Sequence, residues 1–257
     1  MAELRFQLDG VSVRYRARSA LDRVSLRVES GECVGIIGPS GAGKTTLLRL
    51  LVGAVSPMEG RVEVGGRDLD GLSHAELRAL RGATGFVHQD HRLLPTQRVL
   101  TNVLCGRLGR WSVPRALREL LCPRRREQER VHAILDRVGI PEKLFERVDT
   151  LSGGQQQRVA IARALYQAPE ALLADEPVSG VDPARAHDTL GLLLRIARES
   201  ALTLCASVHN VELARAFFPR LIGMRSGRVL FDQPTDSLTD ADFDALYRLA
   251  PEELLET

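Results

Sequence analysis

The feature that most constrains the fold is the segment Gly38–Thr45, which reads Gly-Pro-Ser-Gly-Ala-Gly-Lys-Thr. It fits the phosphate-loop pattern of a glycine, four spacer residues, a glycine, a lysine and a serine or threonine. The chain holds 33 arginines but only two lysines, Lys44 and Lys143, so chance is a poor explanation for a pattern that requires a lysine. The segment therefore predicts a nucleotide-binding chain.

The residues on either side of this loop predict a strand-to-helix turn. Val34–Ile37 is an apolar run typical of a buried parallel strand, and Thr46–Val52 has the spacing of an amphipathic helix. Unpaired N–H groups and the positive dipole end of a helix favour an anion, and glycines let the backbone close around phosphate oxygens. The alternative, a glycine-rich turn that only caps a helix, fits these flanks less well. The predicted ATP-binding residues of the loop are Gly38, Pro39, Ser40, Gly41, Ala42, Gly43, Lys44, Thr45 and Thr46.

Two side chains of the loop have predicted roles of their own. Lys44 is expected to reach the β- and γ-phosphates as a point charge. The Thr45 hydroxyl is expected to take one position on a Mg²⁺ ion that keeps most of its water ligands. The loop thus predicts Mg²⁺ and a nucleotide with β- and γ-phosphates, such as ATP, as the ligands.

A second apolar strand, Ala171–Ala174, ends in the acids Asp175 and Glu176. Ligands of such sheets gather at the carboxyl ends of parallel strands, so Asp175 is the candidate magnesium ligand. Glu176 is placed to polarise a water for in-line attack on the γ-phosphate. Acids after a strand also serve as helix caps or solvated turn residues, and the phosphate loop favours the functional interpretation here.

A third segment, Leu151–Arg158, reads Leu-Ser-Gly-Gly-Gln-Gln-Gln-Arg and opens a helical run. Ser152 is a good N-cap, and the glycines expose backbone N–H groups. A capped helix and a second anion site both fit, and spacing does not choose between them. Leu151–Gln155 resembles the signature motif of ATP-binding cassette (ABC) ATPases, which lies between the phosphate loop and the acidic strand, as here. The resemblance implies that the ATP of a partner subunit is bound by Ser152, Gly153, Gly154 and Gln155.

The same resemblance gives roles to three isolated residues. Tyr15 resembles the aromatic residue that stacks on adenine, and His209 resembles the switch histidine. Gln89 resembles the glutamine that senses Mg²⁺ and the γ-phosphate, and it joins Thr45 and Asp175 as a predicted metal ligand. Considered alone, Tyr15 would be interpreted as an aromatic residue of a strand, Gln89 as a surface amide and His209 as a histidine at the end of a strand. Their order along the chain favours the functional interpretation.

The resemblance also implies an inter-subunit loop that contains Asp182, although Gly180 and Val181 depart from the commoner residues there. The predicted catalytic residues are Glu176, His209 and Lys44. The implied fold is α/β, a phosphate-loop NTPase (RecA-like) core with an antiparallel β subdomain and an inserted helical subdomain. We expect one ABC ATPase domain over 1–257, with 1–89 and 165–257 forming the core and 90–164 the helical subdomain.

Composition narrows the class of protein and its location. A formal charge of +2 and a single tight basic run, Arg124–Arg126, do not indicate a nucleic-acid partner. That run is expected to be a solvated helix start, with contact to phospholipid as the second interpretation. Four dispersed cysteines and no secretory signal at Met1–Leu4 favour the cytosol, and without an apolar stretch of about 20 residues any membrane role must come through separate partner subunits. The family resemblance then implies a peripheral protein on the cytoplasmic face of the inner membrane.

Two segments, one before and one after the signature motif, resemble one subfamily in particular, the ATP-binding subunits of bacterial phosphonate importers. Thr101–Gly109 with Trp111, and Phe243–Arg248, carry this likeness. It implies a homodimer of cassettes, a separate membrane permease that contacts the loop Asp90–Leu100, and a periplasmic substrate-binding protein. Phosphite or another small oxyanion is the alternative cargo. The same motifs would also fit an ABC ATPase accessory to a phosphonate-degrading complex, a soluble ABC protein acting on ribosomes or DNA, or, less well, a phosphate-loop kinase.

Overall fold

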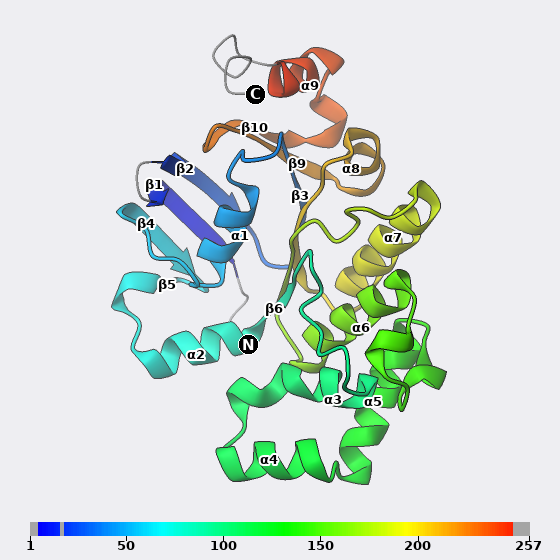
Figure 1. Cartoon of the computed structure of the whole chain (residues 1–257). Helices are drawn as coiled ribbons and strands as arrows, with labels where there is room; N and C mark the ends of the chain where they lie inside the picture. Colours follow the sequence, from blue (N-terminus) through cyan, green and yellow to red (C-terminus); the bar gives the residue numbers. More distant parts are fainter. Residues whose placement is uncertain (1–4, 16–17, 249–257) are drawn as a thin grey trace.

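A six-stranded, mostly parallel sheet forms the centre of the computed structural model, which describes residues 5–15 and 18–248 (Figure 1). Its strand order is β10 (Arg228–Pro234), β9 (Arg220–Arg225), β3 (Cys33–Ile37), β8 (Thr203–Ser207), β7 (Ala171–Ala174) and β6 (Thr84–Val87). All neighbours pair in parallel except β9 and β10, which form an antiparallel hairpin. Strands covered on both faces read as continuous apolar runs, and β3, β7 and β8 are buried throughout.

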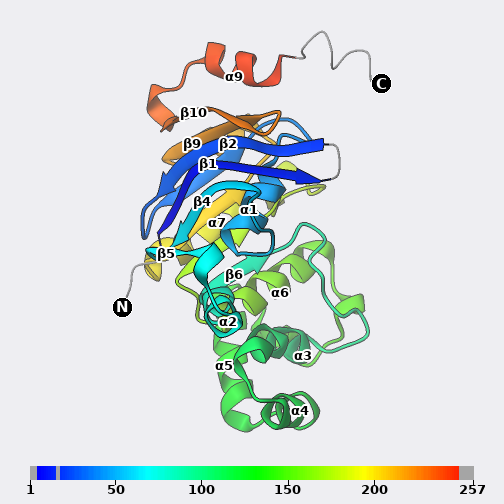
Figure 2. The same cartoon turned by 90° about the vertical axis from the view of Figure 1, so that its left-hand side faces the viewer.

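A smaller antiparallel sheet lies on one side of this centre, as Figures 1 and 2 show. Its order is β2 (Arg18–Val28), β1 (Phe6–Tyr15), β4 (Glu59–Val64) and β5 (Arg67–Asp68). Phe6 is paired with Val28 on one side and Val64 on the other, and all three are buried. Phe6–Tyr15 and Val24–Val28 show the alternation of apolar residues that predicts strands of an antiparallel flank, and that flank is present.

The two faces of the central sheet are covered by different elements, because successive side chains of a strand point to opposite faces. Leu173 and Cys205 pack with the antiparallel sheet and α1 (Lys44–Leu51). Leu172 and Ala206 point the other way. They pack with the helices α6 (Gly153–Tyr166), α7 (Pro183–Glu199) and α8 (Val211–Phe217). The strands thus form the middle layer of three.

A group of helices projects beyond the edge strand β6 (Figure 2). It consists of α3 (Val99–Leu104), the 3-10 turn η2 (Cys105–Arg110), α4 (Val113–Leu121), α5 (Arg125–Arg137), the turns η3 (Pro141–Lys143) and η4 (Val148–Thr150), and α6. Val103, Val131 and Val159 are fully buried where α3, α5 and α6 meet. Helices thus occupy the region where the sequence predicts an insertion, and its division at 90 and 164 stays a prediction.

The remaining helices and turns complete the chain, and one helix begins earlier than its sequence pattern predicts. After the turn η1 (Leu69–Gly71), α2 (His74–Ala83) is capped by Ser73, whose hydroxyl forms a capping box with Glu76. The helix after the phosphate loop begins at Lys44 rather than Thr46, so Lys44 and Thr45 belong to its first turn. The turn η5 (Thr235–Ser237) precedes α9 (Asp240–Tyr247). The sequence pattern predicts a last helix over Asp240–Leu249, and Leu249 lies outside the described residues. No helix in 5–15 and 18–248 is both long enough and apolar enough to cross a bilayer.

Candidate active site

The strand order gathers the predicted functional segments at one edge of the central sheet. The phosphate loop follows β3, and His209 follows the neighbouring strand β8. Asp175 and Glu176 follow β7, and Gln89 follows the edge strand β6. Because β3, β8, β7 and β6 run parallel, their carboxyl ends share one edge, where ligands of such sheets bind.

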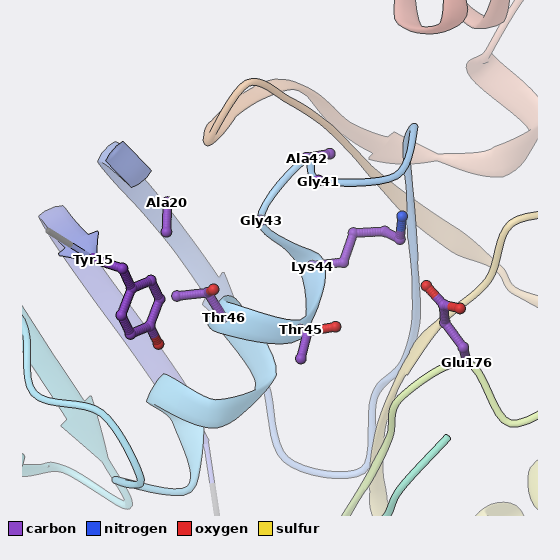
Figure 3. Close-up of a pocket in the computed structure, with 9 residues that line it drawn as sticks. All are labelled: Tyr15, Ala20, Gly41, Ala42, Gly43, Lys44, Thr45, Thr46 and Glu176. Atoms are coloured by element: carbon purple, nitrogen blue, oxygen red, sulfur yellow. The ribbon is translucent and has the colours of Figure 1, made fainter. Parts of the chain in front are cut away.

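A cavity of about 240 Å³ opens at this edge (Figure 3). It is lined by Tyr15, Ala20, Gly41, Ala42, Gly43, Lys44, Thr45, Thr46 and Glu176. Tyr15 ends β1, lines the cavity and is 46% exposed, so its ring is accessible to a planar ligand. The antiparallel sheet thus supplies the aromatic side, and the phosphate loop supplies the backbone N–H groups.

Two positions of the loop require glycine. Gly43 has φ +103° and precedes α1, and a Cβ there would lie 2.5 Å from the Ala20 carbonyl oxygen. Gly38 has φ +148°, and its Cβ would lie 2.0 Å from the Met224 carbonyl oxygen. Side chains are excluded by sterics at both positions, and glycine lets the loop fold tightly at the start of α1.

Lys44 is almost fully buried at the centre of the site, with 4% of its surface exposed. Its Nζ donates to the carbonyl oxygens of Gly38 at 2.7 Å and Pro39 at 3.0 Å. Burial lowers the pKa of this amine, and the nearby Glu176 and Asp175 carboxylates oppose the shift. Figure 3 shows the side chains of Lys44 and Glu176 directed toward each other from opposite sides.

The acid pair is held by hydroxyl groups from two other segments. Asp175 Oδ1 accepts hydrogen bonds from Thr45 Oγ1 and Ser207 Oγ, each at 3.0 Å. Ser207 Oγ in turn accepts the Glu176 N–H at 2.8 Å. A hydroxyl and a carboxylate oxygen in contact are the hard oxygen donors that Mg²⁺ prefers, and Mg²⁺ needs few protein ligands because it keeps several waters. Thr45 and Asp175 therefore fit such an ion.

Glu176 adopts the left-handed conformation, with φ +46°, which is uncommon for a residue other than glycine. Its side chain is 14% exposed, and its Oε1 hydrogen-bonds His209 Nε2. Strained backbone persists only where surrounding contacts hold it, and such residues cluster at functional sites. The Ser207 and His209 contacts hold Glu176 beside the cavity.

Gln89 and Asp182 lie outside the cavity lining. Gln89 is exposed, and its Nε2 lies 3.4 Å from Ser179 Oγ in the loop after Glu176. Asp182 caps α7, with Oδ1 accepting the Arg185 N–H at 3.0 Å and Oδ2 paired with Arg185 Nε at 3.1 Å. The fold therefore brings Gln89 to the Ser179 loop rather than to Thr45 and Asp175.

The signature segment forms the capped helix start that its residues predict. Ser152 Oγ accepts the Gln155 N–H at 3.4 Å, and Gln155 Oε1 accepts the Ser152 N–H at 3.0 Å. Ser152 and Gly153 are exposed, and no signature residue lines the cavity of its own chain. The helix start of α6 is thus open to a second molecule.

The loop that follows Gln89 is tied to the segment that precedes the signature. The Asp149 N–H donates to the Pro95 carbonyl at 2.9 Å, and the Val148 N–H donates to the Gln97 carbonyl at 3.1 Å. The buried Asn102 side chain accepts the Leu94 N–H at 2.7 Å and donates to the Leu94 carbonyl at 3.1 Å. A displacement of this loop would therefore act on the start of α6.

Two histidines, His88 and His91, lie on either side of Gln89 and Asp90. Burial, together with Arg92 and Arg163, lowers the pKa of His88 to about 4. Burial also lowers the pKa of His91. In the described part of the chain, no group of three or more His, Cys, Asp or Glu side chains is placed to hold a metal ion.

Sequence reasoning missed two residues of the site, Ser207 and Ala20. Ser207 carried a signal, because a hydroxyl at the carboxyl end of a fully buried strand requires a partner. Ala20 carried none. Ser179 belongs to the predicted inter-subunit loop, but its contact with Gln89 depends on which loops meet in the folded chain.

Comparison with known proteins identifies the family of the chain. The sequence profile of the ABC transporter family matches residues 21–179. A Pseudomonas putida protein named phosphonates import ATP-binding protein PhnC is 50% identical, over 95% of this chain and 91% of its own length. A Pseudomonas aeruginosa protein named PhnC 2 is 49% identical, over 93% of this chain and 90% of its own length.

Solved structures of similar fold are also cassettes. A dimeric structure of MJ0796, a bacterial ABC transporter cassette, superposes with a TM-score of 0.78 at 30% identity, over 91% of this chain and 100% of that one. The ADP conformation of the cassette MJ1267 superposes with a TM-score of 0.79 at 27% identity, over 98% of this chain and 97% of that one. This chain belongs to the ABC transporter family, as one of its ATP-binding cassettes.

Proposed function

We propose that this ATPase subunit energises the import of phosphonates through a separate membrane permease. The assignment of phosphonates as the cargo is supported by sequence identity. About half of all residues, along more than nine-tenths of the chain, are identical to those of proteins named for phosphonate import. Motifs shared by all cassettes do not account for a likeness of that length. Since the cassette contacts ATP rather than cargo, importers of phosphite or another small oxyanion remain the alternative.

The cavity is proposed to bind ATP with its adenine on Tyr15 and its phosphates in the loop Gly38–Thr46. Lys44 Nζ donates hydrogen bonds to two carbonyl oxygens in this structure. With nucleotide bound, it would donate instead to the β- and γ-phosphates, which are stronger acceptors. The N–H groups at the start of α1 add a positive dipole end beneath them. The affinity for a triphosphate then comes mainly from the loop backbone and one buried amine.

Thr45 and Asp175 are proposed to hold Mg²⁺, with Gln89 as a third ligand after the Ser179 loop releases it. When bound, the ion neutralises charge that develops on the β- and γ-phosphate oxygens. Ser207 would keep Asp175 oriented for this role, because its hydroxyl donates to the same carboxylate oxygen as Thr45.

Glu176 is proposed as the general base of hydrolysis. A water beside its carboxylate attacks the γ-phosphorus and passes a proton to Glu176, while the bond to the β-phosphate oxygen breaks and ADP leaves. His209 would orient the Glu176 carboxylate through the hydrogen bond at Oε1 and contact the γ-phosphate. The strained backbone of Glu176 places the carboxylate before the substrate arrives.

Two copies of the chain are proposed to enclose each ATP, with the loop of one facing Ser152–Gln155 of the other. The signature helix start is exposed and lies away from its own cavity, as such sharing requires. Asp182, at the start of α7, would lie in the interface. ATP then favours the closed pair through γ-phosphate contacts that ADP cannot make, and hydrolysis releases it.

The Ser207→Ala variant is expected to lower the turnover of ATP by roughly tenfold to a hundredfold and to raise the Mg²⁺ concentration needed for half-maximal rate. Removing the hydroxyl leaves Asp175 with one donor fewer and frees the Glu176 N–H. Ser207→Thr keeps the hydroxyl and serves as the rescue. A purely structural role would lower stability and leave the Mg²⁺ dependence unchanged.

The loop Asp90–Leu100 is proposed as the surface that contacts the permease. Leu94 is 49% exposed there, although both of its backbone groups are fixed by Asn102. We expect Leu94→Asp to reduce recovery of the permease by about tenfold, because a charge would enter an apolar contact. The ATPase activity of the isolated chain should stay within about twofold. Leu230→Asp, at an equally exposed leucine on β10, is the control, and a parallel fall of ATPase activity would contradict the placement.

The cargo is tested by growth with a phosphonate, phosphite or phosphate as the sole phosphorus source, with and without the gene. Growth lost only on phosphonates supports the proposal, and growth lost only on phosphite favours the alternative. The proposed partners, a permease and through it a periplasmic binding protein, are tested by isolating the chain from membranes. Recovery with ribosomes or with a phosphonate-degrading complex would contradict an importer at the cytoplasmic face of the membrane.

A further inference from the structure

The helix α4 carries an apolar stripe that the described part of the chain does not cover. Val113, Leu117 and Leu121 are 81%, 59% and 76% exposed, although most leucines and valines of the chain are buried. They are four residues apart, so they lie along one face of the helix. In both views α4 lies at the end of the molecule opposite α9 (Figures 1 and 2).

The opposite side of α4 is anchored, so the stripe is held outward. Glu119 is 1% exposed on the inner side, where it accepts Arg118 Nη2 at 2.8 Å and the Arg124 N–H at 3.0 Å. Leu120, three residues after Leu117, borders the stripe and packs against the core. The orientation of the helix is therefore set mainly by the buried Glu119 carboxylate, and Leu117 cannot turn inward without breaking the hydrogen bonds of that carboxylate.

The surroundings of the stripe are strongly basic. Between 107 and 130 the chain has eight arginines and three glutamates, a net charge of +5, whereas the whole chain carries +2. Arg118, Arg124 and Arg125 are 43%, 62% and 92% exposed even though each is paired with a glutamate. The basic run that the sequence singles out thus lies directly after the apolar face, at the start of α5.

We propose that this α4 face, defined as Val113, Leu117, Leu121 and Arg124–Arg126, rests on the surface of an anionic phospholipid bilayer. The three apolar side chains would enter the boundary between headgroups and acyl chains, and the arginines would contact lipid phosphates. A second copy is a poor occupant, because two surfaces of net charge +5 would meet. A nucleic acid would satisfy the arginines but leave the stripe uncovered.

This inference goes beyond the proposed function, because it assigns direct contact with lipid in place of attachment through a permease alone. Its geometry predicts weak binding, since α4 has only nine residues and offers three apolar side chains. A single weak anchor gives reversible attachment, and stable attachment takes a second contact. The permease contact proposed above would be that second contact.

The chain contains a natural reporter of this contact. Trp111 is its only tryptophan, precedes α4, and carries the Arg115 guanidinium 5.2 Å from its ring centroid. Vesicles of phosphatidylcholine and phosphatidylglycerol in equal parts, added to the purified chain, should shift Trp111 emission to shorter wavelength. They should also sediment the protein about tenfold better than phosphatidylcholine alone, with the difference falling as salt is raised.

Paired variants separate the apolar from the charged contribution. Leu117→Ser with Leu121→Ser, and Arg125→Gln with Arg126→Gln, should each reduce vesicle binding by about tenfold. The matched controls are Met58→Ser with Leu230→Ser, at exposed apolar residues elsewhere, and Arg78→Gln with Arg195→Gln, at exposed arginines of α2 and α7. All four should keep the ATPase activity of the isolated chain, which also shows that they fold.

Equal binding to both kinds of vesicle, no binding, or equal loss in the control variants would overturn the proposal. If the unmodified chain does not bind vesicles and the Leu117→Ser, Leu121→Ser variant no longer recovers the permease, the α4 face contacts a protein rather than lipid. Failure here leaves the proposed function untouched, because vesicle binding and phosphonate-dependent growth are measured separately.

Discussion

Glu176→Gln is expected to lower steady-state ATP hydrolysis by about 10²- to 10⁴-fold, the usual contribution of a general base. Glutamine keeps the volume of the side chain and a partner for His209, but it cannot accept the proton of the attacking water. ATP binding should survive, because the phosphate loop and Lys44 are unchanged. Phosphate release measures the first effect, and nucleotide retention measures the second.

The same variant should accumulate a closed pair of chains in the presence of ATP and Mg²⁺. Triphosphate contacts favour closure, and opening waits for a hydrolysis step that no longer occurs. Gel filtration with and without ATP detects the dimer. Glu199→Gln, at an exposed position of α7, is the control. Undiminished turnover in the Glu176 variant would remove this residue from the role of base.

Ser152→Glu is the second change with a large expected effect, a loss of ATPase activity of about a hundredfold or more. The added carboxylate would stand at the signature helix start, where the γ-phosphate of the partner's ATP is proposed to bind, and like charges repel. Binding of ATP to a single chain should persist, because Ser152 does not line its own cavity. ATP binding and phosphate release, measured on one preparation, separate the two effects.

Ser73→Glu is a matched control for Ser152→Glu, because Ser73 forms the same capping box with Glu76 at the start of α2. Loss of the cap alone would cost about 1 kcal/mol of stability in either variant and leave hydrolysis intact at Ser73. Equal hydrolysis in the Ser152→Glu variant and the unmodified chain would contradict a shared site.

Mixing two inactive variants tests the sharing directly. Lys44→Ala disables the phosphate loop and Ser152→Glu disables the signature, so neither variant alone should form an ATP-dependent closed dimer when Glu176→Gln is added to both. In a mixed pair, the loop of the Ser152 variant faces the signature of the Lys44 variant, and one complete site is restored. An ATP-dependent dimer after mixing, detected by gel filtration, is the expected result. Its absence would favour sites formed within one chain.

Much of the fold could be predicted because its elements depend on local patterns. The phosphate loop, the apolar strand before it and the antiparallel flank are all present. The class of fold and the family, expected from Leu151–Gln155 and its place in the chain, are confirmed. Errors are confined to element ends, as at Lys44, because one turn of helix and a loop share similar residues.

The site was less predictable from sequence than the fold. The predicted Tyr15, Lys44 and Glu176 line one cavity, but the roles given to these side chains stay predictions. Ser207 joins Asp175 to Glu176 through contacts between residues 31 and 32 positions apart in the chain. Such contacts exist only after β7 and β8 have paired, so no local pattern reports them.

The sequence by itself determined which chemical groups this protein has and the order in which strand ends deliver them, because glycine, lysine and acid motifs act through local backbone geometry. Only the tertiary structure decided which groups meet. Strand pairing set Ser207 between the two acids, strain and contacts turned Glu176 toward Lys44, and packing of Glu119 turned the stripe of α4 outward. Each of these results depends on burial and on partners distant in the chain.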